Sequence, residues 1–498
     1  MSFIKNVKRV AVIGGGPCGV ATVKALLKEK SFDKVVAFER RQNTGGLWNY
    51  YNETYDDQKL DVPSVDPHTN LQTPFKVSKD NYVWPSAIYE LLDTNVPYKI
   101  MEYHDFHFPK DSPIFPLKSS VLEYIQAYSK EVEDKVQFNT NVVDVSLTPE
   151  SKYSITYRNV VDSTEGGVKE SQESQHSDKV EEFDAVLIAA GHYDQPFVPD
   201  RPGLKEYSEK YPGSVSHAKS YKHPRQFKNV QGNILIIGNS ASGSDLAYQL
   251  ATGLHRPIYK SARSKSQLPA GSSEFIKTVG DVESVDPETK DVKLVDGTVI
   301  PNVERILYAT GYLRHFPFLR SFNESETPFI TNGSRVERLY RQCLSYDHPT
   351  LSFIALPRYI LPTRISEAQA SWLAKVYSGK IPLPSKETMI KEEEKLIKEK
   401  GTGAAFHNLF YPEDVFYSLA FNKEIETVPG WEDALVPCRW TEEELLYRAN
   451  ATPMKEAFIE YKEKTGKLAT TLEELEEGVG YKPDPIDRSE FPHLKNLN

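Results

Sequence analysis

A glycine turn between a strand and a helix is the feature that most constrains how this chain can fold. Residues 9–13 form an apolar run typical of a buried strand, the stretch 21–30 favours a helix, and residues 34–38 are again strand-like. Three glycines in the spacing GxGxxG stand between the first strand and the helix: Gly14, Gly16 and Gly19. Such glycines permit a tight turn that brings the backbone and the helix N-terminus close to a pyrophosphate. The segment 8–40 is therefore predicted to be a βαβ unit that binds a dinucleotide.

An acidic residue follows the second strand of this unit. Glu39 stands twenty residues past Gly19, at the end of the strand-like segment. A carboxylate at that place accepts hydrogen bonds from ribose hydroxyls and repels a 2′-phosphate. The unit is therefore predicted to bind a nucleotide without a 2′-phosphate, either FAD or NAD.

The chain carries a second unit of the same kind. An apolar run at 234–237 precedes a GxSxxG turn, a helical stretch that ends at Leu254 and a strand-like segment at 257–260. The residues of this turn that we expect to contact a pyrophosphate are Gly238, Ser240, Ser242 and Gly243. Two such units predict an α/β fold with two nested Rossmann-like dinucleotide-binding domains.

Basic and hydroxyl residues replace the acid in the second unit. Arg263 stands twenty residues past Gly243, and Lys260 and Ser261 come shortly before it. A cation and a hydroxyl suit a 2′-phosphate, which an acid would repel. The second unit is therefore predicted to bind NADPH or NADP⁺ in preference to NAD.

The cysteines limit where the electrons of such a chain can go. Cys18, Cys343 and Cys438 lie far apart in the sequence, so we expect neither a redox-active cysteine pair nor a cysteine-based metal site. Without a cysteine pair, the simplest use of two such nucleotide sites is hydride transfer from NADPH to a flavin, with molecular oxygen as the final acceptor. We predict no metal site.

The composition is that of a soluble globular protein. The 498 residues are 39% hydrophobic, and a formal net charge of −10 argues against nucleic acid or an anionic membrane as a partner. No run approaches the roughly 18 apolar residues of a membrane span, and the first residues do not form a secretory signal. We expect no transmembrane anchor and a cytoplasmic location, with peripheral association to the endoplasmic reticulum left open.

Several ordered motifs resemble the class B flavin-containing monooxygenases. The segment 211–221 is similar to the family pattern FxGxxxHxxx(Y/F), and its matching residues are Tyr211 in place of the usual Phe, Gly213, His217 and Tyr221. Residues 44–48 resemble the family segment that follows the acid of the FAD unit, 309–312 resembles its ATG motif, and 366–372 resembles a late helix. Ala190 departs from the Thr of a related strand end, and the absence of a hydrophobic tail indicates a soluble, fungal-type member.

The resemblance also implies an active-site asparagine. Residues 88–97, followed by Met101 and Phe106, are similar to the family segment Y-x-x-L-x-T-N-x-P, which identifies Asn95. A competing Thr69–Asn70 pair lacks the flanking Tyr and the following Met and Phe. The residues that the resemblance adds to the cofactor sites are Gly45, Gly46, Leu47, Trp48, Thr94, Thr310 and Gly311.

The family resemblance implies a reaction as well. NADPH reduces FAD, NADP⁺ stays bound, and O₂ forms a flavin C4a-hydroperoxide that oxygenates the sulfur or nitrogen of small thiols, thioethers or amines. We expect the amide of Asn95 to hydrogen-bond both the hydroperoxide and NADP⁺. We expect structural roles for His217 in the signature segment and for Cys18 in the first turn.

Other functions remain compatible with the residues. A Baeyer–Villiger monooxygenase uses the same modules on ketones, although Tyr221 stands where those enzymes usually carry Trp-Pro. A substrate-specific N-hydroxylase and, outside enzymes, a nucleotide-binding redox sensor are further alternatives. A homodimer is expected only from the frequency of that arrangement among soluble proteins.

The predicted domain plan is discontinuous. Residues 1–210 and 306–400 form the FAD-binding domain, 211–305 the NADPH-binding domain, and 401–498 a charged helical extension. We expect Gly401 to end a helix that begins near Ser385, and the spacings Thr441 to Glu444 and Thr471 to Glu474 predict two capping boxes. The polar stretch 158–182 is expected to be a surface excursion with little core.

Overall fold

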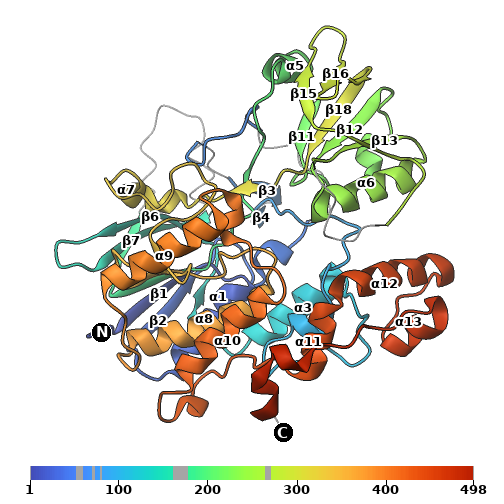
Figure 1. Ribbon diagram of the computed structural model, residues 1–498. Helices are drawn as coiled ribbons and strands as arrows, with labels where there is room; N and C mark the ends of the chain where they lie inside the picture. The colour runs from blue at the N-terminus through green and yellow to red at the C-terminus, as the bar shows by residue number, and fades with distance from the viewer. Residues whose placement is uncertain are drawn as a thin grey trace.

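The structure, a computed structural model, describes residues 2–51, 60–69, 73–78, 81–160, 178–263 and 271–496. Figure 1 shows a larger α/β body, a smaller α/β unit that contains α6 (Ala241–Leu254), and the helices of the C-terminal segment, coloured orange to red. The predicted α/β fold with two Rossmann-like units is confirmed by two separate sheets, each with a central run of parallel strands.

A seven-stranded sheet forms the centre of the larger body. Its strands are β1 (Arg9–Ile13), β2 (Lys34–Phe38), β5 (Val136–Gln137), β9 (Ala185–Ile188), β20 (Leu339–Tyr340), β21 (Leu344–Ser345) and β22 (Leu351–Phe353). They run in the order β20-β21-β22-β9-β1-β2-β5, with every neighbour from β22 to β5 parallel. β1 and β2 have the predicted bounds, since each is a short apolar run buried on both faces.

Helices cover one face of this sheet and a second sheet covers the other. Alternate residues of β1 and β2 share one core with α1 (Pro17–Lys28), α3 (Lys118–Ser129) and α8 (Pro362–Tyr377). The remaining residues of those strands pack on an antiparallel sheet made of β6 (Thr140–Leu147), β7 (Tyr153–Asn159) and β8 (Lys179–Phe183). The expected surface excursion therefore joins β7 to β8, and its residues 161–177 lie outside the described part of the chain.

A five-stranded parallel sheet forms the smaller unit. Its strands, in spatial order, are β11 (Val215–His217), β18 (Val303–Tyr308), β12 (Asn233–Ile237), β13 (Ile258–Ser261) and β14 (Ile276–Val279). α6 packs on one face. On the other face lie α5 (Leu204–Lys210) and an antiparallel sheet of β15 (Val282–Val285), β16 (Val292–Leu294) and β17 (Val299–Ile300). The predicted boundary at 305/306 falls inside β18, which belongs to the smaller sheet along its whole length.

The smaller unit is an insertion in the larger body. β9 and β22 are neighbours in the large sheet, although the whole smaller unit lies between them in the sequence. Two short antiparallel strands, β10 (Gln195–Pro196) and β19 (Tyr312–Leu313), pair where the chain leaves the larger body and returns to it. The two crossings are therefore held together at one junction.

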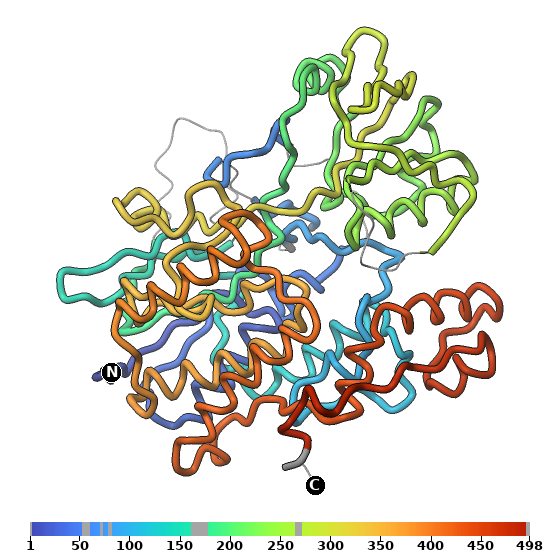
Figure 2. The backbone as a smooth tube through the Cα atoms, viewed as in Figure 1, coloured from blue at the N-terminus to red at the C-terminus, as the bar shows by residue number. Residues whose placement is uncertain are grey.

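The C-terminal segment, here residues 386–496, is mainly helical, as predicted. Its longer helices are α9 (Lys386–Lys400), α10 (Glu413–Ile425), α11 (Glu442–Ala449), α12 (Ala451–Thr465) and α13 (Leu472–Val479). The tube in Figure 2 shows that they lie along the larger body, with α12 below the smaller unit. Among the described residues, none of the helices has the length and apolar character of a membrane span.

The helix ends test the capping predictions. α9 begins after Ser385 and ends at Gly401, and Thr441 and Glu444 form the predicted capping box of α11. At α13 the Thr471 hydroxyl accepts from the Glu474 N–H, but the Glu474 carboxylate accepts from the N–H of Thr470. The second capping box is therefore wrong in its acidic half, because the carboxylate reaches one residue farther back.

Candidate active site

The first glycine turn has no room for a side chain at Gly14 or Gly19. Gly14 has a φ of +111°, and a Cβ on Gly14 would lie 2.5 Å from the carbonyl oxygen of Ala189. A Cβ on Gly19 would lie 1.9 Å from the carbonyl oxygen of Gly14. α1 therefore packs directly on the strand that precedes it, and its N-terminus, with Pro17 in the first turn, opens toward the space beyond Gly16.

A second glycine segment faces the first turn. The N–H of Gly45 donates to the carbonyl of Gly15 at 3.1 Å, and a Cβ on Gly46 would lie 2.9 Å from the Cα of Gly16. Leu47 and Trp48 follow in a short 3-10 helix, Gly46–Trp48. The segment 44–48, which sequence reasoning took from a family resemblance, thus lies against the first turn.

Glu39 is built into the same turn. Its side chain is 4% exposed, and its two carboxylate oxygens accept from the N–H of Gly15 at 2.6 Å and of Arg41 at 2.7 Å. β1 and β2 pair Ile13 with Phe38, so the next residues, Gly14 and Glu39, stand side by side. Charge-assisted bonds of this kind hold the carboxylate in one orientation.

A large cavity opens over these residues. It has a volume of about 1220 Å³, above the roughly 300–1,000 Å³ of common small-molecule pockets. Of the predicted cofactor residues, its lining includes Gly14, Gly16, Glu39, Gly46, Leu47 and Trp48. A closed glycine cradle, a fixed acid and a cavity of this size fit a large dinucleotide such as FAD.

The second glycine turn repeats the backbone of the first. Gly238 has a φ of +125°, and a Cβ there would lie 2.4 Å from the carbonyl oxygen of Ala309. A Cβ on Gly243 would lie 2.1 Å from the carbonyl oxygen of Gly238. Ser240 is exposed at the N-cap of α6 and makes no capping hydrogen bond with its side chain. The helix N-terminus here is open to solvent, and Ser242 is half-buried in its first turn.

The register of the second unit corrects the predicted equivalence of Arg263 with Glu39. β12 and β13 pair Ile237 with Ser261, so the residue beside Gly238 is Ala262. Arg263 comes one residue later, is exposed, and makes no ion pair with any residue that the structure describes. The spacing differs because the second unit reaches this position in nineteen residues from Gly243 instead of twenty.

Ser261 has a different role from the one its sequence position suggested. It is 2% exposed, and its hydroxyl donates to the carbonyl of Gly280 at 2.9 Å. The hydroxyl therefore ties β13 to the following strand. This turn therefore differs from the first in two ways: Ala262 stands where the first turn has Glu39, and the cation of Arg263 follows it.

The signature segment forms the junction between the two units. His217 is 2% exposed, its Nε2 lies 3.0 Å from the carbonyl oxygen of Gly311, and its Nδ1 accepts from the N–H of Lys219 at 3.1 Å. Burial lowers the pKa of His217 to about 3, so the ring is neutral near pH 7. Its expected structural role agrees with these contacts.

The other signature residues belong to the smaller unit. The Tyr221 hydroxyl donates to the side-chain oxygen of Gln249 on α6 at 3.0 Å. Tyr211 packs in the core of the smaller unit, and Gly213 has a φ of +79° in an exposed turn. Thr310 donates its hydroxyl to the Phe197 carbonyl, across the junction of β10 with β19.

Asn95 lies apart from the large cavity. It is exposed in the bend that precedes α2 (Tyr98–Met101), and neither Asn95 nor Thr94 belongs to the cavity lining. Thr94 is buried, with its N–H donating to the Pro116 carbonyl at 3.2 Å and its hydroxyl to the Val96 carbonyl at 3.0 Å. The competing Asn70 lies outside the described residues.

Sequence reasoning missed the charged group beside the cavity. Asp194 pairs with Arg40 at 2.7 Å and with Lys219 at 3.6 Å, and these cations hold its pKa well below the usual range against the effect of burial. Arg41 donates to the backbone carbonyls of Trp84 and Pro85 at 2.8 and 2.9 Å. The only available signal was the position of Arg40 and Asp194 after the ends of β2 and β9.

Cys18 has the predicted packing role. Burial raises the pKa of its thiol to about 12, and its Sγ lies 3.7 Å from the Pro362 carbonyl oxygen. Among the described residues, no group of three or more His, Cys, Asp or Glu side chains is arranged to hold a metal ion.

Comparison with known proteins agrees with this architecture. The family model described as Flavin-binding monooxygenase-like matches residues 7–64, 75–268 and 275–408. The flavin-containing monooxygenase FMO GS-OX-like 4 of Arabidopsis thaliana is 32% identical over 403 residues, which cover 77% of this chain and 79% of the relative. The thiol-specific monooxygenase of Saccharomyces cerevisiae is 25% identical over 463 residues, which cover 88% of this chain and 91% of the relative.

A solved structure has the same fold over nearly the whole chain. The S-allyl-L-cysteine S-oxygenase of Allium sativum superposes with a TM-score of 0.68 at 24% identity and covers 92% of this chain and 94% of its own. The sequence matches are long enough to identify the family, and the structural match extends the common fold into the C-terminal segment. The chain therefore belongs to the flavin-containing monooxygenase family and is a monooxygenase.

Proposed function

We propose that this monooxygenase uses FAD, NADPH and O₂ to oxygenate the sulfur or nitrogen of small soft nucleophiles. NADPH supplies two electrons, one oxygen atom of O₂ enters the substrate, and the other leaves as water. The observation that carries the proposal is the contrast between two glycine turns, one beside Glu39 in a large cavity and one beside Ala262 and Arg263. The names of the yeast and Allium relatives favour sulfur as the acceptor atom.

The larger body would hold FAD. Its pyrophosphate would lie at the N-terminus of α1 against Gly14 and Gly16, and the fixed carboxylate of Glu39 would accept from ribose hydroxyls. Leu47 and Trp48 line the same cavity and would exclude water from the flavin. The flavin supplies the redox and oxygen chemistry, and the protein supplies binding, orientation and exclusion of water.

The smaller unit would hold NADPH. The open N-terminus of α6, with Ser240 and Ser242, would bind the pyrophosphate, and Arg263 would pair with the 2′-phosphate. Thr310 and Gly311 lie at the junction through which this unit faces the larger body. The proposal thus assigns the two cofactors to the two halves of the nested fold.

Asn95 would be the catalytic residue. Its amide has both donors and an acceptor, so it could serve oxygen transfer and the bound nicotinamide at the same time. The stretch before it contacts the smaller unit, since the side-chain N–H of Gln249 on α6 donates to the carbonyl of Leu91 at 3.2 Å, so Asn95 lies near the unit that would bring the nicotinamide. In Asn95→Ala we expect NADPH oxidation to continue while H₂O₂ replaces the oxygenated product. Full coupling of NADPH oxidation to oxygenation in the variant would contradict this assignment.

The first test is spectroscopic. We expect the purified protein to be yellow, to be bleached by NADPH without oxygen, and to recover its colour in air. A colourless protein that takes up no FAD would instead favour a nucleotide-binding sensor without turnover. The same protein is then offered a thiol, a thioether, an amine and a cyclic ketone in parallel. Oxygenation of the ketone alone would identify a Baeyer–Villiger enzyme, and turnover of one amine alone an N-hydroxylase.

A further inference from the structure

The C-terminal segment shares a buried core with the loop that carries Asn95. Ile114 and Phe115, from the stretch that pairs with this loop, pack in one apolar cluster with Phe458 of α12. The N–H of Ile114 donates to the carbonyl of Ala469 at 2.9 Å, so the two regions are also joined through the backbone. The loop is therefore folded against residues that follow the family match, which ends at 408.

Lys455 of α12 places a buried cation against the peptide unit that joins Thr94 to Asn95. The residue is 4% exposed, and its Nζ donates to the carbonyl oxygen of Thr94 at 2.9 Å. The same Nζ lies 4.8 Å from the centroid of the Phe115 ring. A buried ammonium needs such partners, because an unpaired one would be strongly destabilising.

Acidic residues face this ammonium from two other elements. Asp93 lies on the Asn95 loop and Asp245 on α6 of the smaller unit, and both favour the charged form. Burial has the larger effect and lowers the pKa of Lys455 to about 8. Asp93 also pairs with Lys462 of α12 at 2.8 Å, and the Tyr89 hydroxyl donates to Asp245. The loop, α12 and α6 therefore meet at one group of charges.

The carbonyl that Lys455 holds belongs to the peptide unit between Thr94 and Asn95. Because a peptide unit is planar, a donor that holds its oxygen also sets the direction of the Asn95 N–H. The Thr94 hydroxyl closes the same turn on the carbonyl of Val96. Loss of the ammonium would remove the Lys455 donor of this carbonyl, so φ of Asn95, and with it the direction of the Asn95 side chain, would be less restrained.

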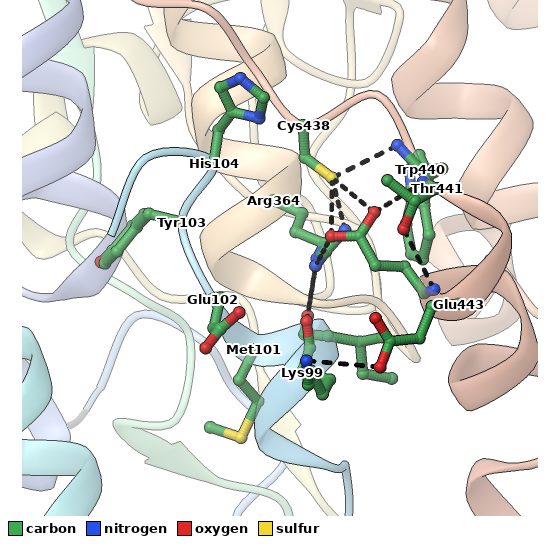
Figure 3. Close-up of polar contacts among 12 residues, drawn as sticks. Lys99, Met101, Glu102, Tyr103, His104, Arg364, Cys438, Trp440, Thr441 and Glu443 are labelled. Carbon is green, nitrogen blue, oxygen red and sulfur yellow. Dashed lines mark hydrogen bonds and ion pairs between the residues drawn. The ribbon is translucent and has the colours of Figure 1, made fainter. Parts of the chain in front are cut away.

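A second cation holds α2, which directly follows the bend at Asn95. Arg364 of α8 donates from Nε to the Ile100 carbonyl at 2.9 Å and from Nη2 to the Lys99 carbonyl at 2.7 Å. Its Nη2 also pairs with Glu444 of α11 at 2.7 Å. Figure 3 shows the Arg364 side chain between the Lys99 backbone and the Cys438 loop. Arg364 therefore holds the residues after the bend, and Lys455 holds the bend itself at Asn95.

We propose that Lys455 is a positioning residue that holds the Asn95 amide in its working orientation through the Thr94 carbonyl. The proposal rests on the proposed function, because it takes Asn95 as the group that serves oxygen transfer. It gives the helix α12, beyond the matched family residues, a part in coupling NADPH oxidation to oxygenation.

The test compares Lys455→Met with wild type and with Lys464→Met in the full-length FAD-loaded protein. Lys464 lies on the same helix, is 55% exposed, and pairs only with Glu460 among the described residues, so its loss is the matched control. We expect Lys455→Met to raise the ratio of H₂O₂ to oxygenated product about tenfold, as loss of a charge-assisted hydrogen bond implies. We expect the anaerobic rate of flavin reduction by NADPH and the FAD content to be unchanged.

Four further results test the proposal and separate its failure from a failure of the proposed function. Adding Lys455→Met to Asn95→Ala should change nothing more, because both substitutions disable the same amide. A folded Lys455→Met protein with wild-type coupling would overturn the inference; if this variant does not retain FAD, Lys455→Ala is measured by the same criterion. A wild-type protein that NADPH does not bleach would overturn the proposed function instead, and coupling retained in Asn95→Ala would overturn the role of Asn95.

Discussion

The two glycine turns have the same backbone and different surroundings. In each, the last glycine packs against the carbonyl of the first, where a Cβ would come within 1.9 Å at Gly19 and 2.1 Å at Gly243. The first turn is faced by a second glycine segment and a fixed acid inside a large cavity, whereas the second is open at Ser240 and followed by an exposed Arg263. The backbone of the turn is therefore common to both units, and the residues packed around it are what differ between them.

The largest expected difference between the two units comes from substituting the last glycine of each turn by alanine. Gly19→Ala should give a colourless protein without FAD, because the added Cβ forces the turn open. Gly243→Ala should keep FAD and lose bleaching by NADPH, since its clash lies in the other unit. The FAD content and the anaerobic rate of bleaching measure the two effects.

Gly403→Ala is the control for these substitutions. Gly403 has a φ of −85° and nothing within 4 Å of a Cβ, so the variant should match wild type. If Gly19→Ala and Gly243→Ala both lost FAD equally, the division of cofactors between the units would be wrong.

Exchanging the charge beside each turn should have the next largest effect. Glu39→Gln removes a carboxylate that accepts two backbone N–H groups, and we expect FAD to bind about 10 to 100 times more weakly. Ala262→Glu puts an acid at the corresponding place in the smaller unit and should raise the KM for NADPH about tenfold while changing that for NADH less. Equal changes for both coenzymes would contradict the register that the structure assigns.

Arg263→Ala tests the cation itself. Loss of a charge-assisted contact to the 2′-phosphate should reduce the preference for NADPH over NADH about tenfold in kcat/KM. Arg256, which donates to the backbone carbonyls of Val230 and Gly232, is a nearby arginine with a structural task, so Arg256→Lys serves as the control. An unchanged preference in Arg263→Ala would remove this residue from the coenzyme site.

At the junction between the units we expect the smallest change in activity, and instead a change in stability with pH. Burial lowers the pKa of His217 to about 3, whereas an unfolded histidine has a pKa of about 6.5. Between these values the unfolded chain binds a proton that the folded chain does not, so stability falls by up to about 1.4 kcal/mol per pH unit as the pH drops through this window. His217→Gln, whose side-chain amide supplies a donor and an acceptor and does not titrate, should lose less of its Tm between about pH 7 and about pH 5 than wild type. Parallel losses would mean that His217 does not titrate in this way.

Local features were predictable from the sequence because neighbouring residues produce them. β1 and β2 are apolar runs with the predicted bounds, and the turn from Gly14 to Gly19 needs glycine for the close approach of its own backbone. The cap at Thr441 follows from a side chain that reaches the N–H three residues ahead. The counterpart of Glu39 was predicted one residue too late, at Arg263 instead of Ala262. Strand register depends on the length of α6 and its loop and not on a fixed spacing.

The sequence by itself thus determined the fold class, the two glycine turns and the opposite charges of Glu39 and Arg263 that follow them. Only the tertiary structure decided what surrounds these turns: the large cavity over the first, the exposure of the second, and the contact of Lys455 with the Thr94 carbonyl. Lys455 and Thr94 are 361 residues apart, and such contacts depend on how whole helices and sheets pack. No local pattern of residues encodes that packing, because a buried charge is stable only where distant elements supply its partners.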